Sequence, residues 1–163
     1  MVYLDNAATS FPKPLRVYDE IDRCMRTYCA NPGRGGHAMS IASGKAVSEA
    51  REKISAFFNI DNPLRLGFTK NATEAINIAI KGVLRPGDHV ITTCMEHNAV
   101  IRPLKTLERD GIISLSIVEG DDFGQIDIGD LLNYINAHTR LIVCTLSSNV
   151  NGIVYPIKEI GRI

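Results

Sequence analysis

Apolar residues recur every three or four positions in the first third of the chain, a spacing that predicts two amphipathic helices. The first has Pro14 near its start, where the missing backbone N–H costs nothing. The apolar positions are Val17, Ile21, Met25 and Tyr28 in the first helix and Val47, Ala50, Ile54 and Phe57 in the second. Between them the segment 31–37, NPGRGGH, holds three glycines and one proline and predicts a turn-rich loop.

From residue 64 onward, strand-like and helix-like stretches alternate. The expected strands are 64–69, 89–95, 113–120 and 140–148, and the expected helices are 73–84, 98–111, 126–139 and a last one that opens at 155. This alternation predicts an α/β fold, with a mainly parallel sheet flanked by helices. No repeat or linker interrupts the pattern, so we expect an N-terminal segment, 1–15, and one domain, 16–163, which ends within a helix.

Composition narrows the range of functions. Hydrophobic residues make up 45% of the chain, charged residues 22%, and the formal net charge is zero. Such a balance is ordinary for a globular domain and gives no general electrostatic reason to bind nucleic acid or a membrane surface. No apolar run is long enough to span a bilayer, and the first ten residues, MVYLDNAATS, lack the pattern of a signal peptide. We therefore expect no nucleic acid, no membrane and a cytoplasmic location.

The four cysteines, Cys24, Cys29, Cys94 and Cys144, form no Cys-x-x-Cys pair. Their spacing fits neither a zinc ribbon nor a disulfide framework, and the histidines show no metal-binding spacing. We expect all four thiols to be reduced and structural, with Cys94 and Cys144 buried in strands, and we expect no metal site.

Ligands of parallel α/β sheets bind at the carboxyl ends of the strands, so the loops after strands carry the most information. In the first, FTKNATEA (68–75), Asn71 is a good N-cap and Glu74 can complete a capping box. Unpaired N–H groups and the helix dipole make such a start an anion site. Asn71, Ala72 and Thr73 could therefore form a phosphate-binding cup, and the commoner alternative is an ordinary capped helix.

Two further loops contribute one candidate each. His97, in MEHNAV (95–100), could stack on a flat ring or move protons, or it could be a capping or surface residue. Asn149, in SSNVNG (147–152), could donate a hydrogen bond to a ligand oxygen or close an Asx-turn. Together, a phosphate cup, an imidazole and an amide at one sheet edge would suit a flat, phosphorylated cofactor that bears an oxygen.

Five stretches occur in an order and spacing that resemble the class V aminotransferase family, in particular its cysteine desulfurase and selenocysteine lyase branch. They are YLDNAATSFPKP, NPGRGGHAMS, FTKNATEAIN, MEHNAV and LSSNVNGIVYPI, and they extend over essentially the whole chain. The resemblance implies a fold-type I enzyme that depends on pyridoxal 5'-phosphate. Residues 16–163 would then be the N-terminal part of its large, cofactor-binding domain.

The resemblance also implies roles for single residues. Ala72 and Thr73 match the phosphate binders, although many relatives have threonine where Ala72 stands. His97 matches the catalytic histidine that stacks on the cofactor ring, and Asn149 matches the amide that binds its phenolic oxygen. The resemblance places Arg34 and His37 near the active site of the family dimer.

The same resemblance places the aspartate that pairs with the pyridinium nitrogen, the lysine that attaches the cofactor and the nucleophilic cysteine beyond Ile163. We therefore expect an N-terminal fragment that is inactive alone and binds the cofactor weakly or not at all. The parent enzyme would convert L-cysteine or L-selenocysteine to alanine, associate as a homodimer or larger assembly, and pass sulfur to an acceptor protein. The alternatives are another class V activity or a non-catalytic α/β phosphate-binding module.

Overall fold

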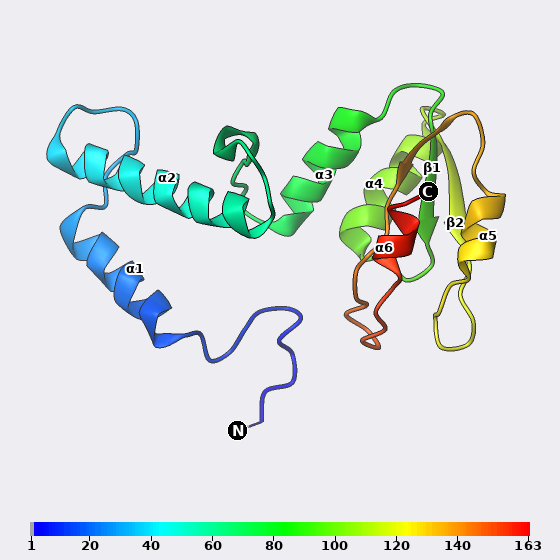
Figure 1. Cartoon of the computed structure of the whole chain (residues 1–163), viewed down its shortest axis with the longest axis horizontal. Helices are drawn as coiled ribbons and strands as arrows, with labels where there is room; N and C mark the ends of the chain where they lie inside the picture. Colours follow the sequence, from blue (N-terminus) through cyan, green and yellow to red (C-terminus); the bar gives the residue numbers. More distant parts are fainter. Residues whose placement is uncertain (1) are drawn as a thin grey trace. The chain divides into compact units, whose positions relative to one another are not determined.

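The computed structural model describes residues 2–163 and falls into two compact units (Figure 1). The first unit ends at Phe68 and the second is Thr69–Ile163. The expected division into segment 1–15 and domain 16–163 stays a prediction.

The first unit contains the two helices that the apolar spacing predicts, α1 (Leu15–Thr27) and α2 (Ala38–Phe57). The loop between them is anchored to α2 by two buried serines. The Ser40 hydroxyl donates to the carbonyl of Asn31 at 2.9 Å, and the Ser43 hydroxyl accepts from the N–H of Ala30 at 3.2 Å. These contacts hold a glycine-rich segment that has no secondary structure of its own.

The strand predicted at 64–69 is wrong. Residues Pro63–Arg65 instead form a short 3-10 helix, η1, because the Asn62 side chain accepts the N–H of Leu64 at 3.0 Å and Pro63 favours a helical first turn. A strand also needs a hydrogen-bonded neighbour, and the one sheet formed by residues 2–163 contains only strands from the second unit. Alternating hydrophobicity alone does not supply that neighbour.

The second unit confirms the predicted α/β class. Its three parallel strands are β1 (His89–Thr93), β2 (Ser114–Val118) and β3 (Thr139–Ile142), in the order β2-β1-β3. Its helices are α3 (Ala72–Val83), α4 (Asn98–Arg109), α5 (Ile128–Asn133) and α6 (Ile157–Ile160). None of the helices within residues 2–163 is long and apolar enough to cross a membrane.

The central strand β1 separates two apolar cores, and all five of its residues are buried. Val90 packs with side chains of α3 and α4, such as Ile80 and Leu104, on one face of the sheet. Ile91 packs on the other face with Leu131 of α5 and Ile160 of α6. Helices therefore cover both faces of the sheet, as Figure 1 shows.

Two predicted elements are shorter than expected. The helix predicted at 126–139 extends only over α5, because the chain turns after Tyr134 and Asn136 accepts the N–H of His138 at 2.9 Å. The strand predicted at 140–148 pairs with β1 only as far as Ile142. After Val143, the chain no longer pairs with β1, and an antiparallel bridge between Ser147 and Val154 closes it into a loop of its own.

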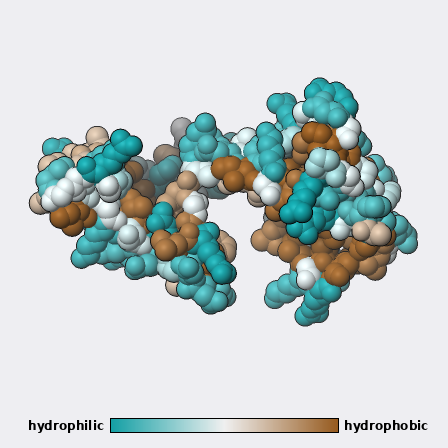
Figure 2. All heavy atoms as spheres, turned by 90° about the horizontal axis from the view of Figure 1, so that it is seen from above, coloured by the Kyte–Doolittle hydropathy of each residue, from teal (hydrophilic) through white to brown (hydrophobic). Residues whose placement is uncertain are grey.

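Large apolar side chains remain at the surface of both units, visible as brown areas in Figure 2. On α1 they include Leu15, Ile21 and Met25, which are 79%, 57% and 68% exposed. In the second unit, Leu146, Val150 and Val154 are exposed on the segment after β3. Isolated apolar residues are common on surfaces, but a repeated series on one helix usually has a partner.

His89 is buried at the start of β1 and links all three strands. Its Nδ1 lies 2.9 Å from the Thr139 hydroxyl and 3.1 Å from the Asn136 amide nitrogen, and its Nε2 lies 2.9 Å from the Ser116 hydroxyl. The amide nitrogen of Asn136 can only donate, so Nδ1 accepts and the proton resides on Nε2. The network therefore requires a neutral ring. Burial, with a smaller effect of nearby His138, lowers the pKa of His89.

Protonation of His89 should destabilise the second unit. An unfolded histidine has a pKa of about 6.5, and the folded pKa is lower, so stability is full above that value and falls as the pH drops below it. We expect His89→Phe to lower the free energy of unfolding at pH 7.5 by roughly 1–3 kcal/mol, because it leaves polar partners unsatisfied. The same substitution should also remove part of the stability loss that the wild-type protein shows between pH 6.5 and 5.

Urea unfolding followed by circular dichroism at several pH values measures both effects. His138→Gln, at an exposed position, is the control and should leave most of the pH dependence in place. If wild type and His89→Phe lose the same amount of stability on acidification, a group other than His89 is responsible for the loss.

Candidate functional site

The strand-end loops lie at one edge of the sheet because the three strands are parallel. Side chains connect these loops to each other. The Tyr155 hydroxyl donates to the carbonyl of Gly124 at 2.7 Å, and the Asn151 amide donates to the carbonyl of Phe123 at 2.6 Å. Gly124 has a φ of +85° and lies so near Met95 that an added Cβ would meet its sulfur at 2.9 Å. This edge is therefore a joined surface, built from segments distant in sequence.

The start of α3 has the geometry of an anion site. Asn71 is its N-cap, and the side-chain oxygen accepts the N–H of Glu74 at 2.9 Å. The Glu74 carboxylate accepts the N–H of Lys70 at 2.9 Å, one residue before the cap, so the reciprocal bond of a capping box is displaced by one position. The N–H groups of Ala72 and Thr73 belong to the first turn, where no intrahelical acceptor exists. They remain for a ligand or solvent.

His97 is the N-cap of α4, and its Nδ1 accepts the N–H of Ala99 at 3.0 Å. A ring nitrogen that accepts carries no proton, so the neutral ring in this arrangement is protonated on Nε2. The side chain is exposed. His97 therefore caps α4 through Nδ1, as one of the two interpretations predicted. Its Nε2 and the face of its ring are still open to a ligand.

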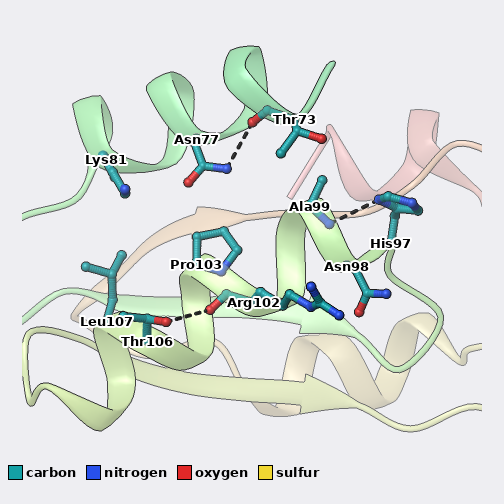
Figure 3. Close-up of a pocket in the computed structure, with 10 residues that line it drawn as sticks. All are labelled: Thr73, Asn77, Lys81, His97, Asn98, Ala99, Arg102, Pro103, Thr106 and Leu107. Atoms are coloured by element: carbon teal, nitrogen blue, oxygen red, sulfur yellow. Dashed lines mark hydrogen bonds between the residues drawn. The ribbon is translucent and has the colours of Figure 1, made fainter. Parts of the chain in front are cut away.

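Thr73 and His97 line the same hollow, which has a volume of about 480 Å³ (Figure 3). In the close-up, Thr73 stands at the first turn of α3, opposite Ala99 and His97 at the start of α4. The remaining lining residues are Asn77, Lys81, Asn98, Arg102, Pro103, Thr106 and Leu107. The fold thus brings the predicted phosphate-binding helix start and the predicted stacking histidine to one pocket.

Asn149 lies apart from that lining. It is exposed in the turn that follows β3. Neighbouring side chains shape this turn: the Ser148 hydroxyl accepts the N–H of Val150 at 3.2 Å, and Asn151 accepts the N–H of Ile153 at 3.2 Å. Within residues 2–163 the Asn149 side chain has no hydrogen-bond partner, so its amide can reach a ligand.

Arg34 and His37 belong to the first unit, so their relation to the pocket stays a prediction. Arg34 is exposed in the glycine-rich loop. His37 is the N-cap of α2, where its Nδ1 accepts the N–H of Ser40 at 3.4 Å. Its local role therefore resembles that of His97 at α4.

Sequence reasoning missed Glu96. Its Oε1 accepts the N–H of Thr145 at 2.6 Å and the hydroxyl of Thr93 at 3.3 Å. Burial raises the pKa of Glu96, and these two hydrogen bonds together with His97 oppose that effect. The available signal was an acidic residue placed between the end of a predicted strand and the cap of the following helix.

The cysteines differ in part from the expectation. None is in a disulfide, but Cys94 is exposed, because β1 ends at Thr93, before it. Cys144 is half-buried, and burial, with a smaller effect of Glu96, raises its pKa to about 11. Within residues 2–163, no group of three or more His, Cys, Asp or Glu side chains is placed to hold a metal ion.

Comparison with known proteins gives a consistent result. The family model for aminotransferase class-V matches residues 2–163. The chain is 37% identical to a probable cysteine desulfurase of Methanothermobacter thermautotrophicus, over 99% of this chain and 40% of that protein. It is 36% identical to a cysteine desulfurase of Serratia proteamaculans, over 98% of this chain and 40% of that protein.

A solved structure supports the same relationship. The apo structure of a cysteine desulfurase from Thermococcus onnurineus superposes with a TM-score of 0.89 at 29% identity, covering 99% of this chain and 40% of that one. The predicted fold class is confirmed, and it is the fold of these enzymes. The chain spans about 40% of the length of the curated relatives it matches.

The Asn71 cap should contribute measurably to stability. Asn71→Ala removes the acceptor for the N–H of Glu74, and we expect a loss of about 1 kcal/mol in the free energy of unfolding. Asn71→Ser retains an acceptor and should recover most of that loss. Asn77→Ala, in the middle of α3, is the control and should cost little, because alanine favours a helix interior. Equal effects of the two alanine variants in urea unfolding would contradict the capping role.

Proposed function

The chain belongs to the aminotransferase class-V family, and on this basis we propose that it is the amino-terminal part of a pyridoxal phosphate-dependent cysteine desulfurase-like enzyme. The observation that carries the proposal is the shared pocket, where the open start of α3 and the ring of His97 meet. The identity of about one third to named cysteine desulfurases supports the choice within the family.

The residues present fit the cofactor expected for this family. Its phosphate suits the N–H groups of Ala72 and Thr73 and the hydroxyl of Thr73, because a helix start attracts anions. Its flat ring suits the exposed imidazole of His97, and its phenolic oxygen suits a donor such as the Asn149 amide. When bound, pyridoxal phosphate supplies an electron sink for bond changes at the α-carbon of an amino acid.

The chain's own residues would bind the cofactor and orient its ring. The start of α3 would hold the phosphate end, which sets the distance of the ring from the sheet edge. His97 would limit the tilt of the ring and hold a proton on Nε2 at the pocket, since Nδ1 is occupied by the N–H of Ala99. Asn149 would add a third point of contact, and three points define the orientation of a flat molecule.

Substrate and partners of the whole protein are part of the proposal. We propose L-cysteine or L-selenocysteine as substrate, with sulfur or selenium passed to an acceptor protein and alanine released. A homodimer would bring Arg34 and His37 near an active site. The exposed apolar residues of α1 are consistent with further association. A cytoplasmic location stays a prediction.

A second candidate is a non-catalytic phosphate-binding module. The observation in its favour is that the pocket is lined by residues of α3, of α4 and by its N-cap His97, all within the second unit. Such a module would bind inorganic phosphate and the cofactor with similar affinity. Another class V activity would share the pocket and differ in the substrate.

Titration with pyridoxine 5'-phosphate tests the binding roles, because this probe has the ring and phosphate of the cofactor without the reactive aldehyde. We expect Thr73→Val and His97→Ala each to weaken its binding roughly tenfold, the loss typical of one hydrogen bond to a charged group or one stacking contact. Thr73→Val should weaken the binding of inorganic phosphate as well, and His97→Ala should leave that binding unchanged. His138→Ala is the matched histidine control. Unchanged affinity in both site variants would contradict the proposed pocket.

Reduction with sodium borohydride in the presence of pyridoxal 5'-phosphate tests whether a lysine of this chain attaches the cofactor. We expect mass spectrometry to find no single lysine of the 163 residues fixed stoichiometrically, since the attaching lysine is expected elsewhere in the parent enzyme. Specific labelling of one lysine would mean that this chain holds its own attachment point. In the full-length protein, release of alanine from L-cysteine tests the activity.

A further inference from the structure

Glu96 lies where three parts of the sheet edge meet. It follows β1 by a few residues and directly precedes His97. Its Oε1 accepts the N–H of Thr145 at 2.6 Å, although Thr145 is 49 positions away in the sequence. The same atom accepts the hydroxyl of Thr93 at 3.3 Å. One carboxylate therefore connects the end of β1, the start of α4 and the segment after β3.

This contact begins where backbone pairing stops. The register of β3 with β1 ends at Ile142, and the N–H of Val143 still donates to Ile91 at 2.9 Å. Next, the Thr92 hydroxyl donates to the carbonyl of Val143 at 3.1 Å. The N–H of Thr145 then goes to Glu96. Side chains thus continue the attachment of the chain to β1 beyond the sheet.

The attached segment carries Asn149. From Thr145 the chain forms a narrow loop, with the N–H of Tyr155 donating to Leu146 at 3.0 Å and an antiparallel bridge between Ser147 and Val154. Asn149 lies in the turn of this loop. Movement at the base, where Glu96 holds Thr145, would therefore displace the turn. The same carboxylate is the immediate neighbour of His97 along the chain.

Burying a carboxylate is unfavourable unless hydrogen bonds compensate for lost solvation. Glu96 is half-buried and lines a hollow together with Cys144 and the apolar residues Ile142 and Val143. A neutral residue could fill this space without that penalty. Packing alone therefore does not explain a carboxylate at this position. Its shortest contact is the hydrogen bond from a backbone N–H, and a charged acceptor strengthens such a bond.

We propose that Glu96 is a positioning residue that holds the His97 loop and the Asn149 loop in a defined relation, so that both side chains meet one ring. This rests on the proposed function, in which His97 and Asn149 contact the cofactor. The proposal gives Glu96 no contact with the ring or the phosphate, because its Oε1 is already engaged by Thr145 and Thr93. Its loss should therefore weaken contacts to the ring and leave the phosphate-binding start of α3 intact.

The test uses the 163-residue chain with three substitutions at one position. Glu96→Ala removes the acceptor, Glu96→Asp shortens the side chain, and Glu96→Gln retains an uncharged acceptor of the same length. Glu119→Ala is the control, since Glu119 is an exposed glutamate directly after β2 at the same sheet edge. For each variant, NMR measures amide exchange at Thr145 and the signals of His97 and Asn149, and titrations measure binding of pyridoxine 5'-phosphate and inorganic phosphate.

We expect Glu96→Ala to speed exchange of the Thr145 amide and to weaken pyridoxine 5'-phosphate by roughly tenfold, the loss of one charge-assisted hydrogen bond. Binding of inorganic phosphate should stay within about twofold, since α3 is untouched. Glu96→Gln should recover most of the affinity and Glu96→Asp little. Glu119→Ala should resemble wild type.

Other results would overturn the inference. Equal weakening of both probes in Glu96→Ala would indicate general destabilisation, and unchanged Thr145 exchange with unchanged His97 and Asn149 signals would show that Glu96 positions neither loop. Absence of binding by the wild-type chain would match the weak or absent cofactor binding expected of the fragment. The two titrations are then made with the full-length protein, where failure to bind either probe would overturn the proposed cofactor role. The exchange rates and signals then still decide whether Glu96 holds the two loops together.

Discussion

The complete burial of β1 is the constraint on which the second unit depends. Its five residues are closed off by β2 and β3 at the sides and by helices on both faces. Both neighbours of this strand are parallel to it, as is usual for a sheet buried on both faces, and parallel strands place all their carboxyl ends at one edge. The position of the candidate site therefore follows from the packing of β1, and no side chain of the site has to specify it.

Polar side chains secure both ends of this buried strand. At its start, His89 joins β1 to residues of β2 and β3 through a neutral ring. Past its end, Glu96 joins it to the segment after β3 through a carboxylate. Both groups are costly to bury and both are satisfied by hydrogen bonds, so each favours one register and one loop arrangement over alternatives that apolar packing alone would permit.

The sequence correctly predicted the elements in which several residues share one apolar periodicity. It failed where a single contact determines the local structure. Periodicity located α1 to α4 and the three strands, because each has several residues that report the same face. The strand at 64–69 failed because a single asparagine, Asn62, starts a turn there and no neighbour is present to pair with. For the site, loop position identified Thr73 and His97 as pocket residues. Glu96 could not be found that way, because its partner, Thr145, is close only after folding.

The pocket and the Asn149 loop differ in how far apart their parts lie in the sequence. Thr73 and His97 come from α3 and α4, which are separated only by β1, whereas Asn149 follows two further helix–strand connections. Closing a short loop costs less entropy than closing a long one, and local contacts form sooner during folding. The helix start and His97 should thus be organised while the chain is still being synthesised, and the Asn149 contact only after β3 has joined the sheet. A ligand that is recognised by its phosphate would then bind to a nascent chain and favour the folding of the segment that later supplies Asn149.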